Sequence, residues 1–159
     1  MIYVVIAALI VAADGLMKGY ISGAIPEYGR MSLIPGIMSL TNHHNYAAAF
    51  SMFGGLQVPI LILTGIFAAL VIWALVTDRI PGTLPRLCAG MVLGGAVGNA
   101  VDRLTLGYVV DMFQTDFINF AIFNIADCFI TVGGIVFCIC LIFGNVIPND
   151  KLKSHDRHS

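Results

Sequence analysis

The stretch VPILILTGIFAALVIWALV, residues 58–76, contains no charged residue. About 20 consecutive apolar residues, wound as a helix, cross the hydrocarbon core of a bilayer. The stretch therefore predicts a membrane-spanning helix, with Trp73 as an aromatic anchor near one end. The whole chain agrees: 58% of its 159 residues are hydrophobic, 11% are charged, and the mean hydropathy is +0.92. A soluble domain carries roughly 25% charged residues, so the composition predicts an integral membrane protein.

Three other apolar stretches reach or approach the same length. They cover about residues 1–21, 84–103 and 121–147. The stretch at 84–103 is rich in glycine, and closely spaced small residues let helix backbones approach, so we expect this helix at the centre of the bundle. The first stretch has no basic segment before it and no small-residue cleavage site after Asp14 and Lys18, which favours a retained helix over a cleaved signal peptide.

The two remaining connections, about 22–57 and 104–120, are too long for simple turns. Both contain short pieces with strand-forming residues, among them Tyr108-Val109-Val110. We therefore predict an all-α polytopic membrane protein with four transmembrane helices and a small extracytoplasmic cap containing short β-strands. The chain is expected to form a single domain over residues 1–159.

Lysine and arginine predict the orientation, because they gather at the cytoplasmic ends of membrane helices. The connection after residue 76 and the C-terminal tail hold Arg79, Arg86, Lys151, Lys153 and Arg157. The other side holds Lys18, Arg30 and Arg103. This bias of five against three predicts that both termini are cytoplasmic and that most acidic residues lie toward the outer face.

Two groups of charged residues lie within the predicted helices, where a single charge costs roughly 2.5–3.5 kcal/mol. Asp14 and Lys18 are four residues apart and share a helix face. They form either an ion pair that holds helices together or a polar pocket that binds the substrate backbone. Asn99, Asp102 and Arg103 form the second group; the guanidinium favours the ionised carboxylate, and we expect structural support more than catalysis.

Two further carboxylates lie on either side of the start of the last apolar stretch. Asp127 follows Asn124 by one helical turn, and Asp111 lies in the preceding loop, which allows it to fold back onto Asp127. Two adjacent carboxylates share one proton, and such a pair activates water against a peptide bond. Spacing alone leaves open the alternative that the two acids separately cap helix ends.

The other polar residues give weaker indications. His43 and His44 are adjacent, lack an evident third ligand, and are interpreted as interfacial residues rather than a metal site. The cysteines are interpreted as buried free thiols: Cys88, Cys128, Cys138 and Cys140. A net charge of −1 provides no basic face for nucleic acid. No metal or organic cofactor is implied.

Five motifs follow one another along nearly the whole chain. They are ADGLMK (13–18), NYAAAF (45–50), GGAVGNAVDR (94–103), VVD (109–111) and FNIAD (123–127). In this order they resemble the motifs of lipoprotein signal peptidase, or signal peptidase II, a family of membrane aspartyl proteases. The resemblance implies a four-helix protease with an outer cap, in a bacterial cytoplasmic membrane, whose active site is at the outer face.

The resemblance also implies the reaction and the residues. The expected enzyme removes signal peptides from diacylglyceryl-modified prolipoproteins, cleaving before the lipidated cysteine. Asp111 and Asp127 match the catalytic pair. The substrate-binding or supporting residues are Asp14, Lys18, Asn45, Asn99, Asp102, Arg103 and Asn124. The implied partners are lipid-modified prolipoproteins, membrane lipids and globomycin-type inhibitors, without a metal.

Some positions depart from the family pattern. Ala47 replaces a usual glycine, Gly15 and Met17 stand where Gln and Thr are common, and Cys128 stands where Ser is common. None of these changes removes a group that the chemistry requires. Two other functions compete with the protease. A proton- or ion-coupled transporter would have acids near mid-bilayer and an internal repeat, and a non-catalytic scaffold would use its aspartates only for packing.

Overall fold

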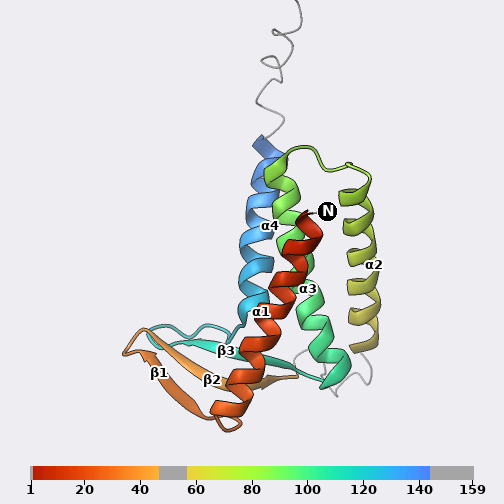
Figure 1. Cartoon of the computed structure of the whole chain (residues 1–159). Helices are drawn as coiled ribbons and strands as arrows, with labels where there is room; N and C mark the ends of the chain where they lie inside the picture. Colours follow the sequence, from red (N-terminus) through yellow and green to blue (C-terminus); the bar gives the residue numbers. More distant parts are fainter. Residues whose placement is uncertain (1, 47–56, 144–159) are drawn as a thin grey trace, which may run out of the picture.

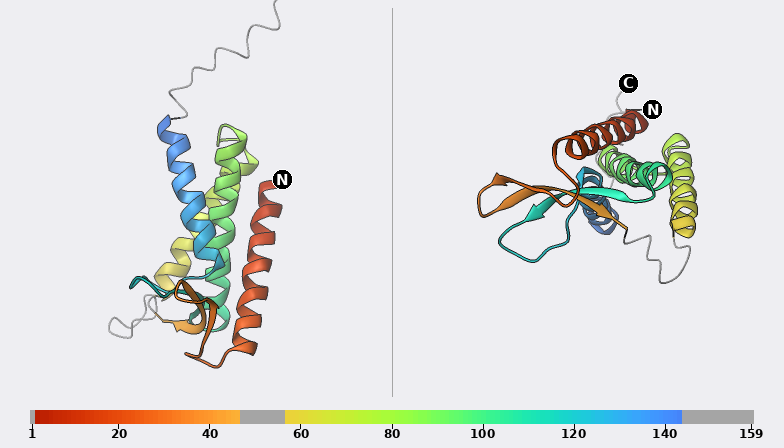
Figure 2. Two further views of the ribbon diagram at one scale, coloured as in Figure 1. Left: turned by 90° about the vertical axis from the view of Figure 1, so that its left-hand side faces the viewer. Right: turned by 90° about the horizontal axis from the view of Figure 1, so that it is seen from below.

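The computed structural model describes residues 2–46 and 57–143. Its helices are α1 (Ile2–Ala24), α2 (Gln57–Val76), α3 (Thr83–Thr105) and α4 (Ile125–Phe143). Its strands are β1 (Arg30–Ile34), β2 (Met38–Asn45) and β3 (Val109–Thr115). The four helices are long and apolar enough to cross a membrane. They lie side by side, and the small sheet crosses one end of the bundle (Figures 1 and 2), so the predicted fold class is confirmed.

The glycine-rich helix α3 is the centre of the bundle and packs against α1, α2 and α4. Its glycines allow this close packing. A Cβ atom on Gly94 would lie 2.8 Å from the carbonyl oxygen of Ala7 in α1. A Cβ atom on Gly95 would overlap the carbonyl group of Ala126 in α4. The two neighbours therefore approach the α3 backbone too closely for any larger residue at these positions.

The last helix begins later than the sequence predicts, at Ile125 instead of residue 121. The cause is strand-like pairing: the Phe113 amide donates to the Phe123 carbonyl oxygen at 2.8 Å, and the two residues form a β-bridge. The backbone preceding the helix thus belongs to the sheet end of the molecule. The predicted end of this helix, residues 144–147, lies outside the described residues, as does most of the 45–50 motif.

The three strands form an antiparallel sheet in the order β1-β2-β3. The end of α1 packs onto the sheet through an apolar cluster formed by Ile21, Ile25, Leu40, Val110 and Met112. Residue Asp111 of β3 lies opposite His43 of β2 in the register. The sheet therefore holds Asp111 at the end of the bundle where α3 ends and α4 begins.

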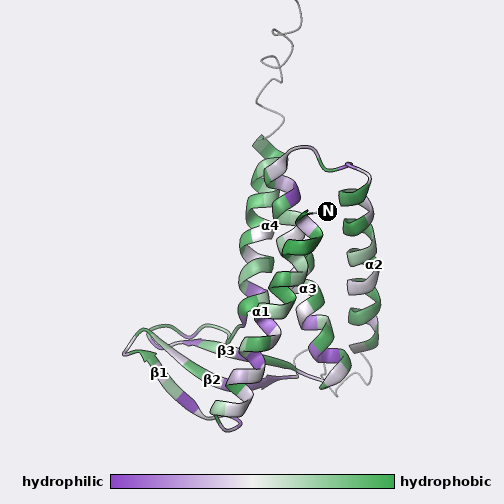
Figure 3. Cartoon of the chain, viewed as in Figure 1, coloured by the Kyte–Doolittle hydropathy of each residue, from purple (hydrophilic) through white to green (hydrophobic). Residues whose placement is uncertain are grey.

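The helices are mostly apolar, and hydrophilic residues gather where α1 and α3 approach the sheet (Figure 3). Many large apolar side chains of the helices are exposed. Helix α4 presents one face to α3 and another outward. This explains why the prediction of buried thiols is wrong for most of the cysteines. Cys88 is buried, but Cys128 and Cys138 are exposed on α4 and Cys140 is half-buried. All four thiols are free.

Candidate active site

Three helices and two strands bring polar side chains together at the sheet end of the bundle. The residues are Asp14 and Lys18 from α1, Asn45 from β2, Asn99, Asp102 and Arg103 from α3, Asp111 from β3, and Asn124 and Asp127 at the start of α4. All the predicted site residues are connected here by hydrogen bonds or ion pairs.

Asn124 and Asp127 cap α4 reciprocally. The Asn124 side-chain oxygen accepts from the Asp127 backbone N–H at 2.9 Å, and the Asn124 backbone N–H donates to Asp127 Oδ2 at 3.1 Å. This is the geometry of a capping box, which satisfies backbone donors at a helix N-terminus. Capping uses one carboxylate oxygen of Asp127 and fixes the orientation of the other.

Asn99 holds that second oxygen. Its Nδ2 donates to Asp127 Oδ1 at 2.8 Å. Its Oδ1 accepts from Lys18 Nζ at 3.0 Å and from Asn124 Nδ2 at 3.1 Å. Since an ammonium group only donates, the Asn99 oxygen must face Lys18, and the Asn99 amide NH₂ must then face Asp127. Lys18 thus determines which atom of Asn99 the carboxylate meets.

Asp111 is held from two sides in the interior. Asn45 Nδ2 donates to its Oδ2 at 2.7 Å, and Asn124 Nδ2 donates to its Oδ1 at 2.6 Å. The residue is 1% exposed. Burial raises the pKa of the Asp111 carboxyl to about 6, and the Asp127 charge adds to this rise. The two asparagine hydrogen bonds and the charge of Lys18 act in the opposite direction.

One residue, Asn124, therefore contacts both carboxylates: its side chain donates to Asp111 and its backbone to Asp127. The environments of the two acids differ. Asp111 is buried, whereas Asp127 is partly exposed. A pair of neighbouring carboxylates in unlike environments is the arrangement that separates a proton donor from a proton acceptor.

Lys18 is the buried cation of the network. Its ammonium lies 2.7 Å from Asp14 Oδ2 and 2.9 Å from Asp102 Oδ2. The other Asp14 oxygen accepts from the backbone N–H of Ala126 in the first turn of α4, at 2.9 Å. The predicted Asp14–Lys18 pair is thus present, and it also ties α1 to the beginning of α4. A buried charge is tolerated only with such partners.

The predicted pairing of Asp102 with Arg103 is wrong. Asp102 pairs with Lys18 and accepts from the Val110 backbone N–H at 3.2 Å. Arg103 donates instead to the backbone oxygen of Asn99 at 3.1 Å. The physical reason is helical geometry, because consecutive residues of a helix do not face each other. Asp102 joins α3 to α1 and β3. Its role in structural support stays a prediction.

The sequence did not reveal an aromatic group beside the site. His44 stacks on Tyr108 with ring centroids 4.0 Å apart, and its Nδ1 lies 3.0 Å from Glu27. Tyr46 lies 5.2 Å from Tyr108. The sequence did predict a strand at Tyr108 and its neighbours. It did not predict the register with β2, which brings Tyr108 beside His44.

The departures from the family pattern that fall on described residues disturb no contact of the network. A Cβ atom on Gly15 would meet nothing within 4 Å, and Cys128 is exposed. Met17 packs against the apolar cluster between the end of α1 and the sheet. Ala47 lies outside the described residues.

Fold and site together define a class: a membrane-embedded enzyme with paired carboxylates, suited to the chemistry of an aspartic protease. The family model of signal peptidase (SPase) II matches residues 6–143. The chain belongs to the signal peptidase II family and is an integral membrane protease of the aspartic type.

Individual relatives agree. The lipoprotein signal peptidase of Lactobacillus johnsonii is 40% identical over 142 residues, covering 89% of this chain and 92% of that protein. The lipoprotein signal peptidase of Streptococcus pneumoniae is 39% identical over 141 residues, with coverage of 89% and 92%. A solved bacterial membrane enzyme superposes with a TM-score of 0.81 and 29% identity, covering 88% of this chain and 92% of that one.

Proposed function

We propose that this protease removes signal peptides from diacylglyceryl-modified prolipoproteins, cleaving before the lipidated cysteine, and that Asp111 and Asp127 are its catalytic pair. The observation that carries the assignment of the pair is the contact of Asn124 with both carboxylates. Each carboxylate has two hydrogen-bond donors that fix its orientation. Such prior orientation is what water activation against a peptide bond requires.

In the proposed reaction buried Asp111, whose pKa is raised, is the proton donor, and partly exposed Asp127 is the base. Asp127 takes a proton from water as the water oxygen bonds to the peptide carbon, and Asp111 gives its proton to the carbonyl oxygen. The carbon–nitrogen bond then breaks: Asp127 protonates the leaving nitrogen, and Asp111 takes a proton from a hydroxyl of the intermediate. The pair returns to its initial state with one shared proton.

We further propose that the enzyme lies in a bacterial cytoplasmic membrane with both termini in the cytoplasm and the site at the outer face. The distribution of Lys and Arg supports this orientation. The start of α1, the end of α4 and the α2–α3 connection lie together at the end opposite the sheet (Figure 1). A substrate anchored by acyl chains would then reach the site laterally from the lipid. Membrane lipids and globomycin-type inhibitors are further expected partners.

The transporter alternative is not favoured: Asp102 lies near the end of α3 and Asp127 near the start of α4, and Asp14 accepts from the backbone N–H of Ala126 in the first turn of α4. The comparisons also favour the protease.

The test replaces each acid by its neutral isostere. We expect Asp111→Asn and Asp127→Asn to lower the rate of precursor cleavage about 10²–10⁴-fold, the usual contribution of a positioned acid or base. The measurement is conversion of a diacylglyceryl-modified precursor by purified enzyme in lipid vesicles. Asp78→Asn is the matched control, because Asp78 pairs with Arg86 at the opposite end of the bundle. Correctly inserted, stable variants that still process the precursor would exclude this catalytic pair.

A further inference from the structure

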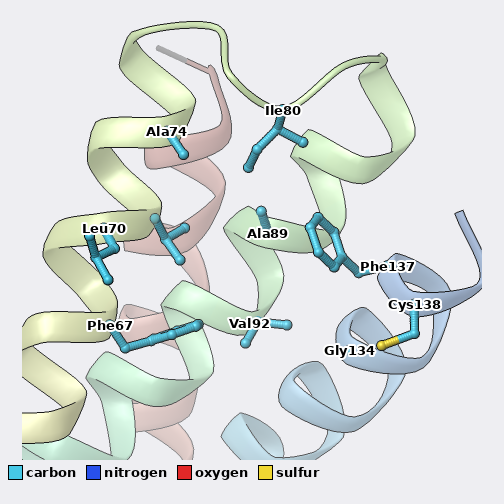
Figure 4. A pocket seen from close by; sticks show the side chains of 10 residues that line it. Phe67, Leu70, Ala74, Ile80, Ala89, Val92, Gly134, Phe137 and Cys138 are labelled. Atoms are coloured by element: carbon cyan, nitrogen blue, oxygen red, sulfur yellow. The ribbon is translucent and has the colours of Figure 1, made fainter. Parts of the chain in front are cut away.

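An apolar groove of about 390 Å³ lies between α2, α3 and α4, away from the carboxylates. Its walls include Phe67 and Leu70 from α2, Ala89 and Val92 from α3, and Gly134 and Phe137 from α4 (Figure 4). Every residue that lines it is apolar or glycine, with the thiol of Cys138 at one edge. The proposed reaction does not use this groove.

The groove exists because α2 packs chiefly on α3, so that its side toward α4 is not filled by protein. Leu70, on the α2 wall, is 58% exposed. In the membrane the groove is therefore accessible from the lipid, at a depth where an apolar segment of another molecule is stable. A groove with this lining offers no partner for a charged headgroup.

The groove lies farther from the sheet than the proposed catalytic pair, along α4. Gly134 follows Asp127 by seven residues (127 to 134), which is about 10 Å along a helix at about 1.5 Å per residue. Cys138 is about 16 Å from Asp127 by the same reckoning. The groove thus begins about two helical turns from the site, on the side away from the sheet. It continues toward the end of the bundle that we place at the cytoplasm.

We propose that this groove binds the apolar helix of the substrate's own signal peptide. The inference rests on the proposed function, since that function supplies the occupant. The apolar region of a signal peptide has about 7–15 residues, and as a helix it is about 10–22 Å long. It precedes the scissile bond and must lie in the membrane on the cytoplasmic side of it. The groove occupies that depth, beside the helix that carries Asp127.

The lining also favours a helix over a lipid chain. Small residues stand on all three walls: Ala74 on α2, Ala89 on α3 and Gly134 on α4. Small residues allow two helix backbones to approach closely, which is how helices associate in membranes without a hydrophobic driving force. A Cβ atom on Gly134 would meet nothing within 4 Å, so this position is open to the groove and not occupied by the protein's own packing.

The test fills the groove from Gly134. Because a Cβ atom at position 134 would meet nothing within 4 Å, Gly134→Leu directs a larger side chain into the groove. Gly65→Leu is the matched control, because Gly65 is exposed on α2, is not a lining residue, and has equally free space for a Cβ atom. Two diacylglyceryl-modified substrates are compared: the full precursor, and a peptide that begins a few residues before the scissile bond and lacks the apolar region.

We expect Gly134→Leu to raise KM for the full precursor about tenfold, which corresponds to about 1.4 kcal/mol. Its kcat/KM for the short peptide should stay within about twofold of wild type, the scatter of such comparisons. Gly65→Leu should change neither. Equal KM values of the two variants for the precursor would overturn the inference and leave the proposed function intact. Equal losses of kcat/KM on both substrates would also overturn it. They would mean that the groove binds an acyl chain, which both substrates carry, or that the substitution destabilises the enzyme.

A second measurement does not depend on Leu fitting at position 134. A photoreactive phenylalanine analogue replaces Leu70 in the groove or, as control, Ile72, which is 41% exposed and does not line the groove. Ile72 follows Leu70 by two residues and so faces the opposite side of α2. In the Asp127→Asn background, the analogue at position 70 should cross-link to the signal peptide of the precursor, and the one at position 72 should not. Equal cross-linking from both positions contradicts the inference. Cleavage of the precursor by the Asp127→Asn enzyme itself would instead contradict the proposed function.

Discussion

The two halves of the helix bundle are built on opposite principles. Toward the sheet, α1, α3 and α4 meet over buried charged and amide groups, each held by partners from another element. Toward the other end, the apolar helix α2 packs on α3 and leaves a groove beside α4. The polar half fixes atoms for chemistry, and the apolar half leaves space. A protease for membrane-anchored substrates needs both, because the scissile bond requires orientation whereas the rest of the substrate requires room.

The largest expected effect breaks the polar half at its cation. Lys18→Met leaves Asp14 and Asp102 as buried carboxylates without their ammonium partner. Removing one member of a buried ion pair costs about 3–5 kcal/mol. We expect a decrease of this size in the free energy of unfolding, measured by denaturant titration in detergent micelles.

The matched control removes a cation from the other half. Arg86 pairs with Asp78, which is largely exposed, so Arg86→Met should cost about 0–1 kcal/mol. A decrease for Lys18→Met no larger than that for Arg86→Met would show that the polar network does not stabilise the fold.

The next prediction concerns pH and sharpens the roles within the polar half. As the proposed proton donor, Asp111 would act when protonated, and its pKa is raised to about 6. The pH profile of kcat/KM, which reports the pKa values of the free enzyme, should therefore have a falling limb above about pH 6. Because the Asn124 hydrogen bond lowers the pKa of Asp111, Asn124→Ala should move this limb to higher pH as well as reduce the rate.

The measurement is kcat/KM for precursor cleavage across pH 5 to 9, about two units on either side of neutrality. Asp116→Asn is the control and should leave the limb in place, because Asp116 follows β3 and pairs with Arg30. A limb that moves to lower pH in Asn124→Ala would contradict Asp111 as the proton donor.

Different parts of this structure were predictable to different degrees. The four helices follow from length and apolar composition, and the central place of α3 follows from its glycines. The start of α4 was predicted too early, because the bridge between Phe113 and Phe123 is a non-local contact. The groove was not predicted, since α2 is apolar on all sides and its sequence marks no face for it.

The site shows the same limit. The Asp14–Lys18 pair is local, and spacing predicted it. The Lys18–Asp102 pair joins two helices, and the sequence suggested the neighbouring arginine in its place. Spacing left the partner of Asp127 open, and the family resemblance selected Asp111. The hydrogen bonds of Asn124 support that choice. They let Asp127 cap the start of α4 and still share the contact with Asn124 that reaches Asp111, so the two predicted alternatives are compatible.

The smallest expected effect compares two faces of α4 within the apolar half. On α4, adjacent glycines face different surroundings: a Cβ atom on Gly133 would lie 3.0 Å from the Cys88 carbonyl oxygen, whereas one on Gly134 would meet nothing within 4 Å. Gly133→Ala should therefore destabilise the protein by about 1–3 kcal/mol through overpacking against α3. Gly134→Ala should stabilise it by up to about 1 kcal/mol, because alanine is the better helix former. Denaturant titration of both variants measures the difference. Opposite signs would establish a packed face and an open face on consecutive residues, and a loss of stability in Gly134→Ala would mean that the groove is closed in the folded enzyme.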